Sequence, residues 1–185
     1  MGKLIYSMLT SLDGYVADRA GDFSWAQPDE EVLAAVNDWT APIGMYLYGR
    51  RMYELMEVWE NDPDLRASSP GSADFADIWT AADKVIYSTT LTSVTTSRTK
   101  LLSVFDAEGV RSLKRDSEQD LDISGPTLAA EAFRRALVDE VRLIVCPVII
   151  GGGLPAFPGV RADLRLIGTQ SFTGGVTAVH YTVKK

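Results

Sequence analysis

Three short polar stretches of this sequence each follow an apolar run: Tyr-Gly-Arg-Arg at 48–51, Tyr-Ser-Thr-Thr at 87–90 and Ser-Gly-Pro-Thr at 124–127. Glycine lets an anion approach the backbone, hydroxyl groups add hydrogen-bond donors, and guanidinium groups bind phosphate in a bidentate way. Ligands of open α/β sheets lie outside the carboxyl ends of the strands. The three stretches therefore favour a nucleotide that carries a pyrophosphate and an additional ribose phosphate.

Arg50 and Arg51 also have a simpler interpretation. Cations are disfavoured where a helix begins, because the aligned peptide dipoles give that end a partial positive charge. The alternative is that both side chains extend into solvent or pair with Glu54 and Glu57 along the helix. A bound phosphate would instead neutralise them, and the repetition of such stretches at three places favours the phosphate interpretation.

Other residues that often do chemistry are few. His180, the only histidine, lies in an alternating segment without a partner motif, which argues against histidine triads and predicts no metal site. Cys146, the only cysteine, lies in an apolar run and is predicted to be a buried, inert thiol. No G-x-G-x-x-G follows the first apolar run, and G-x-x-x-x-G-K-[ST] is absent. This scarcity argues against a hydrolase and is tolerable for an enzyme whose cofactor carries the chemistry.

Composition narrows the class of protein further. The 185 residues suffice for one domain, predicted to span 1–185, and 46% hydrophobic with 23% charged residues is ordinary for a globular protein. A net charge of −7 argues against binding to nucleic acid or to an anionic membrane. A single cysteine allows no intramolecular disulfide, and we find neither a signal peptide nor an apolar run long enough for a membrane span. We expect a cytoplasmic protein.

Strands and helices that would position the polar stretches alternate along the chain. The predicted strands are 3–9, 43–49, 84–88, a segment near 100–104, 121–124 and 141–151, followed by a hairpin over 164–183 that turns at Gly174-Gly175. The predicted helices are 27–39, 50–59, 73–84 with Ser72 as N-cap, a segment after Asp106, and 127–137, whereas 60–72 is predicted to be a surface loop. This order predicts a single three-layer α/β domain with a mostly parallel central sheet and an antiparallel C-terminal hairpin.

The same stretches, taken with others, resemble a known family. Thr-Ser-Leu-Asp-Gly-Tyr-Val-Ala-Asp, Leu-Tyr-Gly-Arg-Arg-Met-Tyr-Glu, Asp-Ile-Ser-Gly-Pro-Thr-Leu and Ile-Ile-Gly-Gly-Gly-Leu-Pro occur in this order over nearly the whole chain. Together they resemble the dihydrofolate-reductase-like family, which includes the reductase domain of the bifunctional riboflavin-biosynthesis deaminase-reductase. The resemblance implies a mixed sheet flanked by helices, NADPH bound across the strand ends, and hydride transfer to a small planar heterocycle.

The resemblance also implies roles for individual residues. Those expected at the cofactor are Gly49, Arg50 and Arg51 at its phosphates, Ser88 and Thr89 near the adenosine ribose, Gly125, Pro126 and Thr127 under the pyrophosphate, and Gly151 and Gly152 near the nicotinamide. Those expected at the substrate are Ser11, Asp13, Trp25 and Glu30, with Glu31 as an alternative to Glu30. Asp13 is also the candidate catalytic residue, although Asp-Gly is by default a turn. Trp25 has ordinary core packing as its alternative.

Two departures from the family pattern bear on ligand choice. Family members often have Ser-Arg-Thr where this chain has Ser88-Thr89-Thr90, so NADH stays open beside NADPH. Tyr15 stands where the riboflavin-pathway reductases usually carry lysine, which weighs against their phosphorylated substrate, 5-amino-6-(5-phosphoribosylamino)uracil, and slightly favours a pterin-like compound. A non-catalytic nucleotide- or ligand-binding protein on the same fold is the alternative function. The family often pairs subunits, so a homodimer is expected, with the C-terminal sheet edge covered by a second chain.

Overall fold

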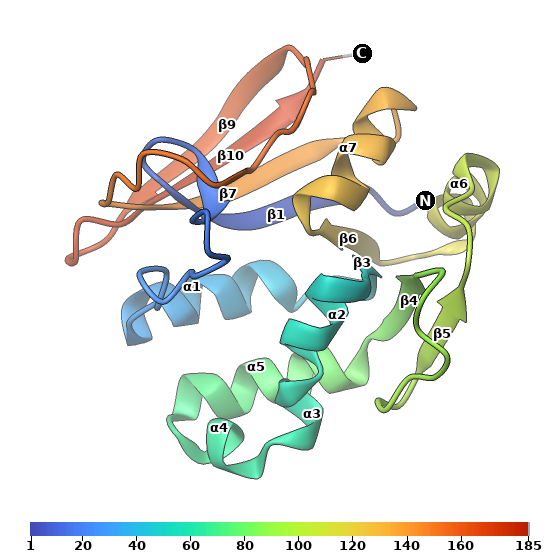
Figure 1. The fold of residues 1–185 in the computed structure, drawn as a ribbon, viewed down its shortest axis with the longest axis horizontal. Coiled ribbons are helices and arrows are strands. Elements are labelled where there is room, and N and C mark those ends of the chain that lie inside the picture. Colours follow the sequence, from blue (N-terminus) through green and yellow to red (C-terminus); the bar gives the residue numbers. More distant parts are fainter. Residues whose placement is uncertain (185) are drawn as a thin grey trace.

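Strand β1 (Leu4–Ser11) runs through the middle of an eight-stranded sheet in the computed structural model, which describes residues 1–184 (Figure 1). The strand order is β5-β4-β3-β6-β1-β7-β10-β9. The first six strands of this order are parallel, and β10 is antiparallel to both β7 and β9. The predicted mixed, mostly parallel sheet with an antiparallel C-terminal hairpin is confirmed.

The other elements have the following bounds. The strands are β2 (Tyr15–Ala17), β3 (Ile43–Gly49), β4 (Asp83–Tyr87), β5 (Thr99–Leu102), β6 (Asp120–Ser124), β7 (Glu140–Cys146), β8 (Leu154–Pro155), β9 (Leu164–Ser171) and β10 (Thr177–Val183). The helices are α1 (Glu30–Thr40), α2 (Arg50–Met56), α3 (Val58–Asn61), α4 (Pro63–Ala67), α5 (Pro70–Ala81), α6 (Ala107–Asp116) and α7 (Pro126–Arg134). β2 and β8 form a separate two-stranded sheet.

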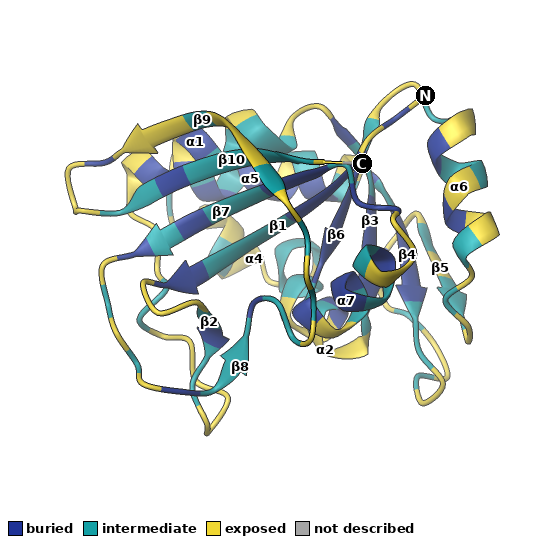
Figure 2. Cartoon of the chain, turned by 90° about the horizontal axis from the view of Figure 1, so that it is seen from above, coloured by how far each residue is buried: buried dark blue, intermediate teal, exposed yellow. Residues whose placement is uncertain are grey.

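Helices cover both faces of the sheet, because successive side chains of each strand point to opposite faces. Ile5 packs with Leu33 of α1 and Trp79 of α5 on one face, whereas Tyr6 packs with Ala129 of α7 and Val110 of α6 on the other. Figure 2 shows that buried residues gather in the inner strands and that the edge strand β9 is largely exposed. The predicted three-layer arrangement is therefore confirmed.

The segment 60–72 was predicted to be a loop, and this prediction is wrong. It contains α4 and the start of α5, each opened by a polar cap followed by proline. Asp62 accepts hydrogen bonds from the N–H groups of Asp64 and Leu65, and Ser69 accepts one from Ser72. Ser69, not Ser72, is thus the N-cap of α5. The Asp-Pro and Ser-Pro pairs are cap-and-first-turn signals, because proline has no N–H to leave unpaired there.

Smaller differences occur at other element ends. Helix α1 begins after Asp29, whose carboxylate accepts a hydrogen bond from the N–H of Val32, so Pro28 lies outside it. The predicted helix 50–59 is divided into α2 and α3 at Glu57. Strand β7 stops at Cys146, since Pro147 cannot donate to the ladder. The helix expected after Asp106 is confirmed, and the structure adds that Asp106 is its N-cap.

Candidate functional site

The three polar stretches lie side by side at one edge of the sheet. Strand register places Tyr48 opposite Ser124 and Gly49 opposite Tyr87, so the turns that follow β4, β3 and β6 are neighbours. The backbone of Gly125, with φ 93° and ψ 116°, has a conformation that a residue with a Cβ rarely adopts. Its missing Cβ would lie 3.4 Å from Cβ of Met52 in α2, which shows how closely the two turns approach. The structure thus brings together three groups of predicted cofactor residues.

Arg50 and Arg51 form the first turn of α2 and lack strong partners. The nearest carboxylate to Arg50 is Glu54 at 3.8 Å, with both side chains nearly half exposed, so this pair contributes little stability in water. Arg51 makes no ion pair within residues 1–184, and Glu57 accepts a hydrogen bond from the Thr95 hydroxyl at 2.6 Å. Of the alternative pairings, only the weak one with Glu54 forms.

The hydroxyl groups at these turns differ in how many hydrogen bonds they already make within the protein. The hydroxyl oxygen of Ser88 accepts hydrogen bonds from the N–H groups of Thr90 and Leu91 at 3.1 and 3.0 Å, which fixes the turn after β4. Thr89 and Thr127 are exposed. A Cβ atom added to Gly49 would have no other part of the protein within 4 Å, so the backbone there has open space beside it. These features suit the approach of phosphate oxygens to the backbone and to threonine hydroxyls.

Asp13 ties two loops together next to this group. Its carboxylate accepts hydrogen bonds from the N–H groups of Ile150 and Gly151 at 3.2 and 2.8 Å, joining the turn after β1 to the loop after β7. A hydrogen bond from Ser11, with those two N–H groups, holds the pKa of Asp13 below its usual range. Ser11 is buried, and its hydroxyl also accepts from the N–H of Tyr15 at 3.0 Å. A low pKa makes Asp13 a poor proton donor, so the geometry favours a positioning role for it.

The glycines after β7 pack against the β2 segment. A Cβ on Gly153 would lie 2.0 Å from the carbonyl oxygen of Ala17, so no larger residue fits. A Cβ on Gly152 would lie 3.0 Å from Nε of Arg19, whose guanidinium therefore covers this glycine. Figure 2 shows β2 and β8 just beyond the ends of β1 and β7. Gly151 and Gly152 are thus brought to the predicted substrate loop, and Arg19 is a nearby cation that the sequence analysis missed.

The remaining predicted substrate residues lie around the start of α1. Glu30 is exposed, with Oε2 3.1 Å from the Cβ position of Gly71, so it faces α5. Glu31 accepts a hydrogen bond from the N–H of Thr173 in the β9–β10 turn at 3.0 Å. Neither carboxylate contacts β1. Trp25 is partly buried, and its Nε1 has no acceptor among the described residues.

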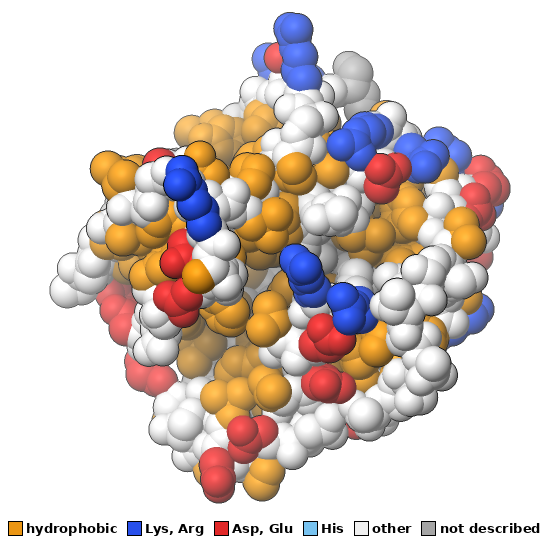
Figure 3. Space-filling view, in the orientation of Figure 1, with side chains coloured by type: hydrophobic (Ala, Val, Ile, Leu, Met, Phe, Trp, Pro, Cys, Tyr) orange, Lys and Arg blue, Asp and Glu red, His pale blue; other side chains and the backbone are white. Residues whose placement is uncertain are grey.

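A central strand buried between neighbours should be covered on both faces, yet β1 is not. Ser7, Met8 and Leu9 are only partly buried, although β1 has β6 on one side and β7 on the other. The Sδ atom of Met8 lies 3.3 Å from the backbone nitrogen of Gly125, so this stretch borders the turn after β6. Figure 3 shows a hollow on this side of the molecule, lined by hydrophobic side chains and bordered by Lys and Arg side chains. Side chains alternate along β1, so Ser7 and Leu9 point to the face covered by α1, and Met8 points to the face covered by α7. We call Ser7 and Leu9 the cleft floor.

Sequence analysis also missed a buried carboxyl group close to the cleft floor. Asp122 in β6 is 3% exposed, and its Oδ1 lies 2.5 Å from the hydroxyl of Ser124. Burial raises the pKa of Asp122 to about 6, although hydrogen bonds from Ser124 and Ser7 and the charge of Arg142 act in the opposite direction. The signal was present in Leu-Asp-Ile-Ser, where the acid occupies an inward position of an otherwise apolar strand.

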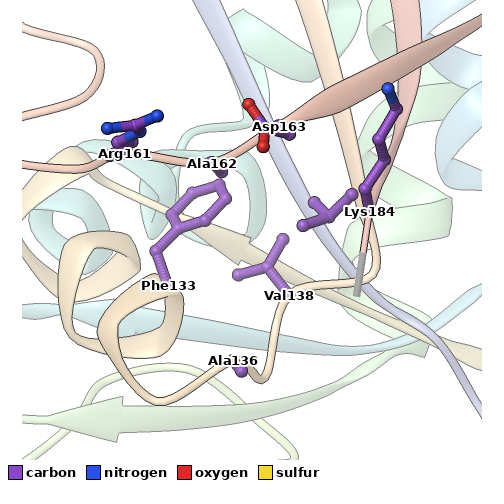
Figure 4. Close-up of a pocket in the computed structure, with 8 residues that line it drawn as sticks. Phe133, Ala136, Val138, Arg161, Ala162, Asp163 and Lys184 are labelled. Atoms are coloured by element: carbon purple, nitrogen blue, oxygen red, sulfur yellow. The ribbon is translucent and has the colours of Figure 1, made fainter.

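Two other hollows lie at the opposite, amino end of the strands. One of about 330 Å³ is lined by Phe133, Ala136, Val138, Arg161, Ala162, Asp163, Val183 and Lys184, and Figure 4 shows Lys184 directing its ammonium group away from Phe133 and Val138. The second, of about 350 Å³, is lined by residues 1–3, Asp139, Glu140, Thr182 and Val183. Neither includes a predicted site residue, and parallel sheets bind ligands at the other end.

Metal-binding clusters and membrane-spanning helices are both absent from residues 1–184. No cluster of three or more His, Cys, Asp or Glu side chains suited to a metal occurs among them. None of the helices described is both long and apolar enough to cross a membrane. Cys146 is buried, which raises the pKa of its thiol, and His180 lies 2.8 Å from Glu140 inside an ion-pair cluster. These positions agree with the structural roles expected for both residues.

Comparisons with known proteins agree with this architecture. The chain is 26% identical to the uncharacterized protein YyaP of Bacillus subtilis (strain 168), over 97% of this chain and 94% of the relative. It superposes on RibD of Acinetobacter baumannii with a TM-score of 0.70 at 17% identity, covering 100% of this chain and 59% of that one. It also superposes on the dihydrofolate reductase of Enterococcus faecalis, complexed with NADP(H), with a TM-score of 0.64 at 12% identity, covering 99% and 97%.

The two structural likenesses show a reductase-type fold. The family model described as the RibD C-terminal domain matches residues 2–178, which is nearly all of the sequence. This chain therefore belongs to the RibD C-terminal domain family, within the dihydrofolate-reductase-like fold.

Proposed function

We propose that this protein is an NADPH-dependent reductase that transfers hydride to a small planar heterocycle. One observation carries the proposal. Three glycine- and hydroxyl-bearing turns, with two arginines that lack strong partners, lie next to an uncovered stretch of a central strand. The turns suit a phosphate-bearing cofactor, and the cleft floor offers room beside them for a flat ring.

The described residues fit the cofactor. Gly125 has a positive φ and no side chain that would cover its own backbone, and Gly49 has open space beside it. Arg50 and Arg51 would neutralise phosphate charge, and Thr89 and Thr127 would donate hydrogen bonds from exposed hydroxyls. NADPH, when bound, would supply the hydride. The protein would bind it, orient its ring toward the substrate and exclude water from the cleft floor.

Cofactor preference follows from the charges. A 2′-phosphate adds negative charge that the arginines could bind, and this favours NADPH over NADH. Thr89 stands where family members often have arginine, so the preference rests on Arg50 and Arg51 alone. NADH binding is therefore measured in parallel.

The sequence left two candidate substrates, a pterin-like compound and a phosphorylated aminopyrimidine, and the structure bears on each of them. A pterin usually needs a carboxylate from the helix that follows β1, but Glu30 faces α5 and Glu31 is engaged with Thr173. A phosphorylated aminopyrimidine would need a cation near the substrate loop, and Arg19 beside Gly152 is one. The structure thus strengthens the case for 5-amino-6-(5-phosphoribosylamino)uracil that Tyr15 had weakened, and we carry both compounds into the test.

The test measures binding and turnover separately. Quenching of tryptophan fluorescence should saturate at micromolar NADPH, and absence of a saturable signal with both NADPH and NADH would reject the reductase. Oxidation of NADPH is then followed with dihydrofolate and with the aminopyrimidine ribosyl phosphate. Turnover at roughly 1–1,000 per second with either compound would identify the substrate class. Binding without turnover across pterins, flavin precursors and quinone-like compounds would favour the non-catalytic ligand-binding alternative.

A further inference from the structure

A polar seam crosses the middle of the sheet on the face covered by α1 and α5. Register aligns Asp122 of β6 with Ile5 and Tyr46, and Ser124 with Tyr48, in successive rows on this face. Asp122 is 3% exposed. An ionised carboxylate is costly to bury unless a cation and hydrogen bonds compensate it. No ion pair to Asp122 forms within residues 1–184, so its charge state needs an explanation.

Hydrogen bonding around Asp122 is best satisfied when the carboxyl is protonated. The hydroxyl of Ser124 lies 2.5 Å from Asp122 Oδ1 and 3.0 Å from the carbonyl oxygen of Ser7. A hydroxyl has a single proton, and the carbonyl can only accept. Each contact has its own proton if the protonated carboxyl of Asp122 donates to the hydroxyl of Ser124, and that hydroxyl donates to the carbonyl oxygen of Ser7. The hydroxyl of Ser7 is a second hydrogen-bonding neighbour of the same carboxyl group.

The groups that face Asp122 leave it able to exchange a proton near neutrality. Tyr46 and Tyr48 on β3 and Tyr6 on β1 have pKa values raised by burial and by the charge of Asp122, so they stay neutral. Arg142 on β7 is the cation that acts on Asp122, while it also lies 3.8 Å from Glu140. Glu140 in turn is paired with Lys3 and His180. The pKa of Asp122, raised to about 6 by burial, lies in the range useful for proton transfer.

Ser7 connects this buried acid to the candidate site. It is partly exposed and belongs to the cleft floor, and its chain neighbour Met8 borders the turn after β6 from the opposite face of β1, where its Sδ contacts Gly125. We propose that Asp122 stores the proton that the reduction consumes, that Ser7 passes it to a substrate on the cleft floor, and that Ser124 orients the carboxyl group. This inference rests on the proposed reductase function.

The proton balance is as follows. The carbon of a C=N bond in the substrate gains two electrons and one hydrogen as hydride, and the nitrogen of that bond takes a further proton from the Ser7 hydroxyl. Once Ser7 has given up its proton it becomes the better acceptor, and the proton of Asp122 moves from its contact with Ser124 to the Ser7 oxygen. The hydroxyl of Ser124 then donates to the carboxylate left behind, which regains its proton from solvent. Asp122 itself does not touch the substrate, so it is a positioning residue that acts through Ser7.

The first experiment reads the protonation of Asp122 without any substrate. Carbon-13 NMR of labelled aspartate carboxyl groups is recorded over a pH titration, and the signal lost in Asp122→Asn is assigned to Asp122. We expect a titration midpoint of about 6. A midpoint near 4, the value of an ordinary aspartate, would overturn the proposal because the acid would be ionised throughout. Asp116→Asn is the matched control, since Asp116 accepts a hydrogen bond from Ser112 at 3.1 Å but is exposed.

The second experiment compares pH profiles of NADPH oxidation. The wild-type rate should fall above about pH 6. Asp122→Asn and Ser7→Ala should each lower the maximal rate roughly 100-fold and flatten that profile, while NADPH affinity changes less than about twofold. Asp116→Asn should behave as wild type. A wild-type profile in Asp122→Asn would reject the relay and leave the reductase standing.

Failure of the reductase function gives a different result. Wild-type protein that does not bind NADPH rejects that function, and the relay falls with it whatever the midpoint. In a protein that binds NADPH but reduces neither compound, the NMR midpoint decides: about 6 supports the proton store, and near 4 rejects it.

Discussion

Charged side chains are arranged in opposite ways at the two ends of the same strands. At the amino end, Glu140 is bonded to Lys3 at 2.7 Å and to His180 at 2.8 Å, and Lys114 is bonded to Asp139. At the carboxyl end, the only carboxylate near Arg50 lies 3.8 Å away, and no described residue forms an ion pair with Arg51. Pairs at the amino end fix β1, β7 and β10 together, whereas cations at the carboxyl end remain available to an anion.

The difference separates stability from binding. An ion pair that involves a nearly buried carboxylate cannot lose one partner without leaving a charge poorly compensated. Half-exposed arginines are solvated instead, and their removal costs the fold little. Substitutions at the amino end should therefore change unfolding without changing ligand affinity, and those at the carboxyl end should do the reverse.

The largest effect is expected for Glu140→Gln. Lys3, His180 and Arg142 would lose their shared carboxylate, and the free energy of unfolding should fall by about 3–4 kcal/mol in urea denaturation at neutral pH. Burial by itself would raise the pKa of Glu140. Hydrogen bonds from Lys3 and His180 lower the pKa by a larger amount, so the net pKa lies below 4.5. The stabilisation is therefore present above pH 4.5 and should be lost as the pH falls through the lowered pKa.

An exposed carboxylate provides the control for that measurement. Glu108 on α6 pairs with Arg111 and Arg115, and Glu108→Gln should cost less than about 1 kcal/mol. Equal losses in both variants, or a change in NADPH affinity in Glu140→Gln, would contradict the division between the two ends.

Next in size is the double substitution of Arg50 and Arg51 by alanine. Loss of two charge-assisted contacts should weaken NADPH binding about 100-fold, close to 3 kcal/mol, with unfolding changed by less than about 0.5 kcal/mol. Arg134 and Arg135 on α7 are a matched adjacent pair, similarly exposed but bonded to Glu131. Their double alanine variant should bind NADPH as wild type. Unchanged affinity in the Arg50 and Arg51 variant would return these residues to a solvent-exposed role.

Asp122 combines a property of each end. It is buried like Glu140, but like Arg51 it has no ion pair among the described residues. Its pKa is raised from 3.8 to about 6 on folding, so its contribution to stability is full below pH 3.8 and is lost as the pH rises through 6. Asp122→Asn should therefore be more stable than wild type by about 2–3 kcal/mol at pH 8. The two proteins should converge near pH 4, and a variant less stable at pH 8 would show that the carboxylate is well compensated.

The smallest effect on stability is expected at the sheet edge. Homodimerisation remains a prediction. The feature that best supports it is the edge strand β9, where the side chains of Leu166 and Ile167 are 51% and 45% exposed. Leu166→Lys should convert a dimer to a monomer in light scattering at micromolar concentration, with unfolding of the monomer changed by less than about 0.5 kcal/mol. A monomer mass for the wild-type protein would reject the dimer. Register in β9 shifts beside Gly168, a bulge of the kind that often protects an edge from pairing.

Features set by local sequence were predictable. Alternation of apolar residues and the Gly174-Gly175 turn indicated the C-terminal hairpin, and the helix expected after Asp106 is α6. Turns at 49–51 and 125–127 were identified because glycine, proline and arginine mark them directly. The short helix α4 was missed because loop composition at 60–72 outweighed the Asp-Pro start signal.

Features that depend on distant pairing were not predictable. Asp13 bonds to Gly151, and Gly152 lies against Arg19, through contacts between the first and last parts of the chain. The polar seam required the register between β1 and β6, which no local pattern specifies. Sequence located the three polar turns that we propose for the cofactor, but the cleft floor and the acid beneath it emerged only from the sheet.

The central place of β1 has a consequence for how the chain folds. Leu4 pairs with Leu121 and Ile5 with Glu140, so β1 finds its two neighbouring strands only after more than a hundred further residues have been synthesised. Closing such long loops is slow, since entropy is lost before any contact forms. β3 and β4 can pair early, while β1 waits as an unpaired apolar segment. The nascent protein is thus most prone to aggregation before β7 is complete, and the cleft floor is among the last parts of the molecule to form.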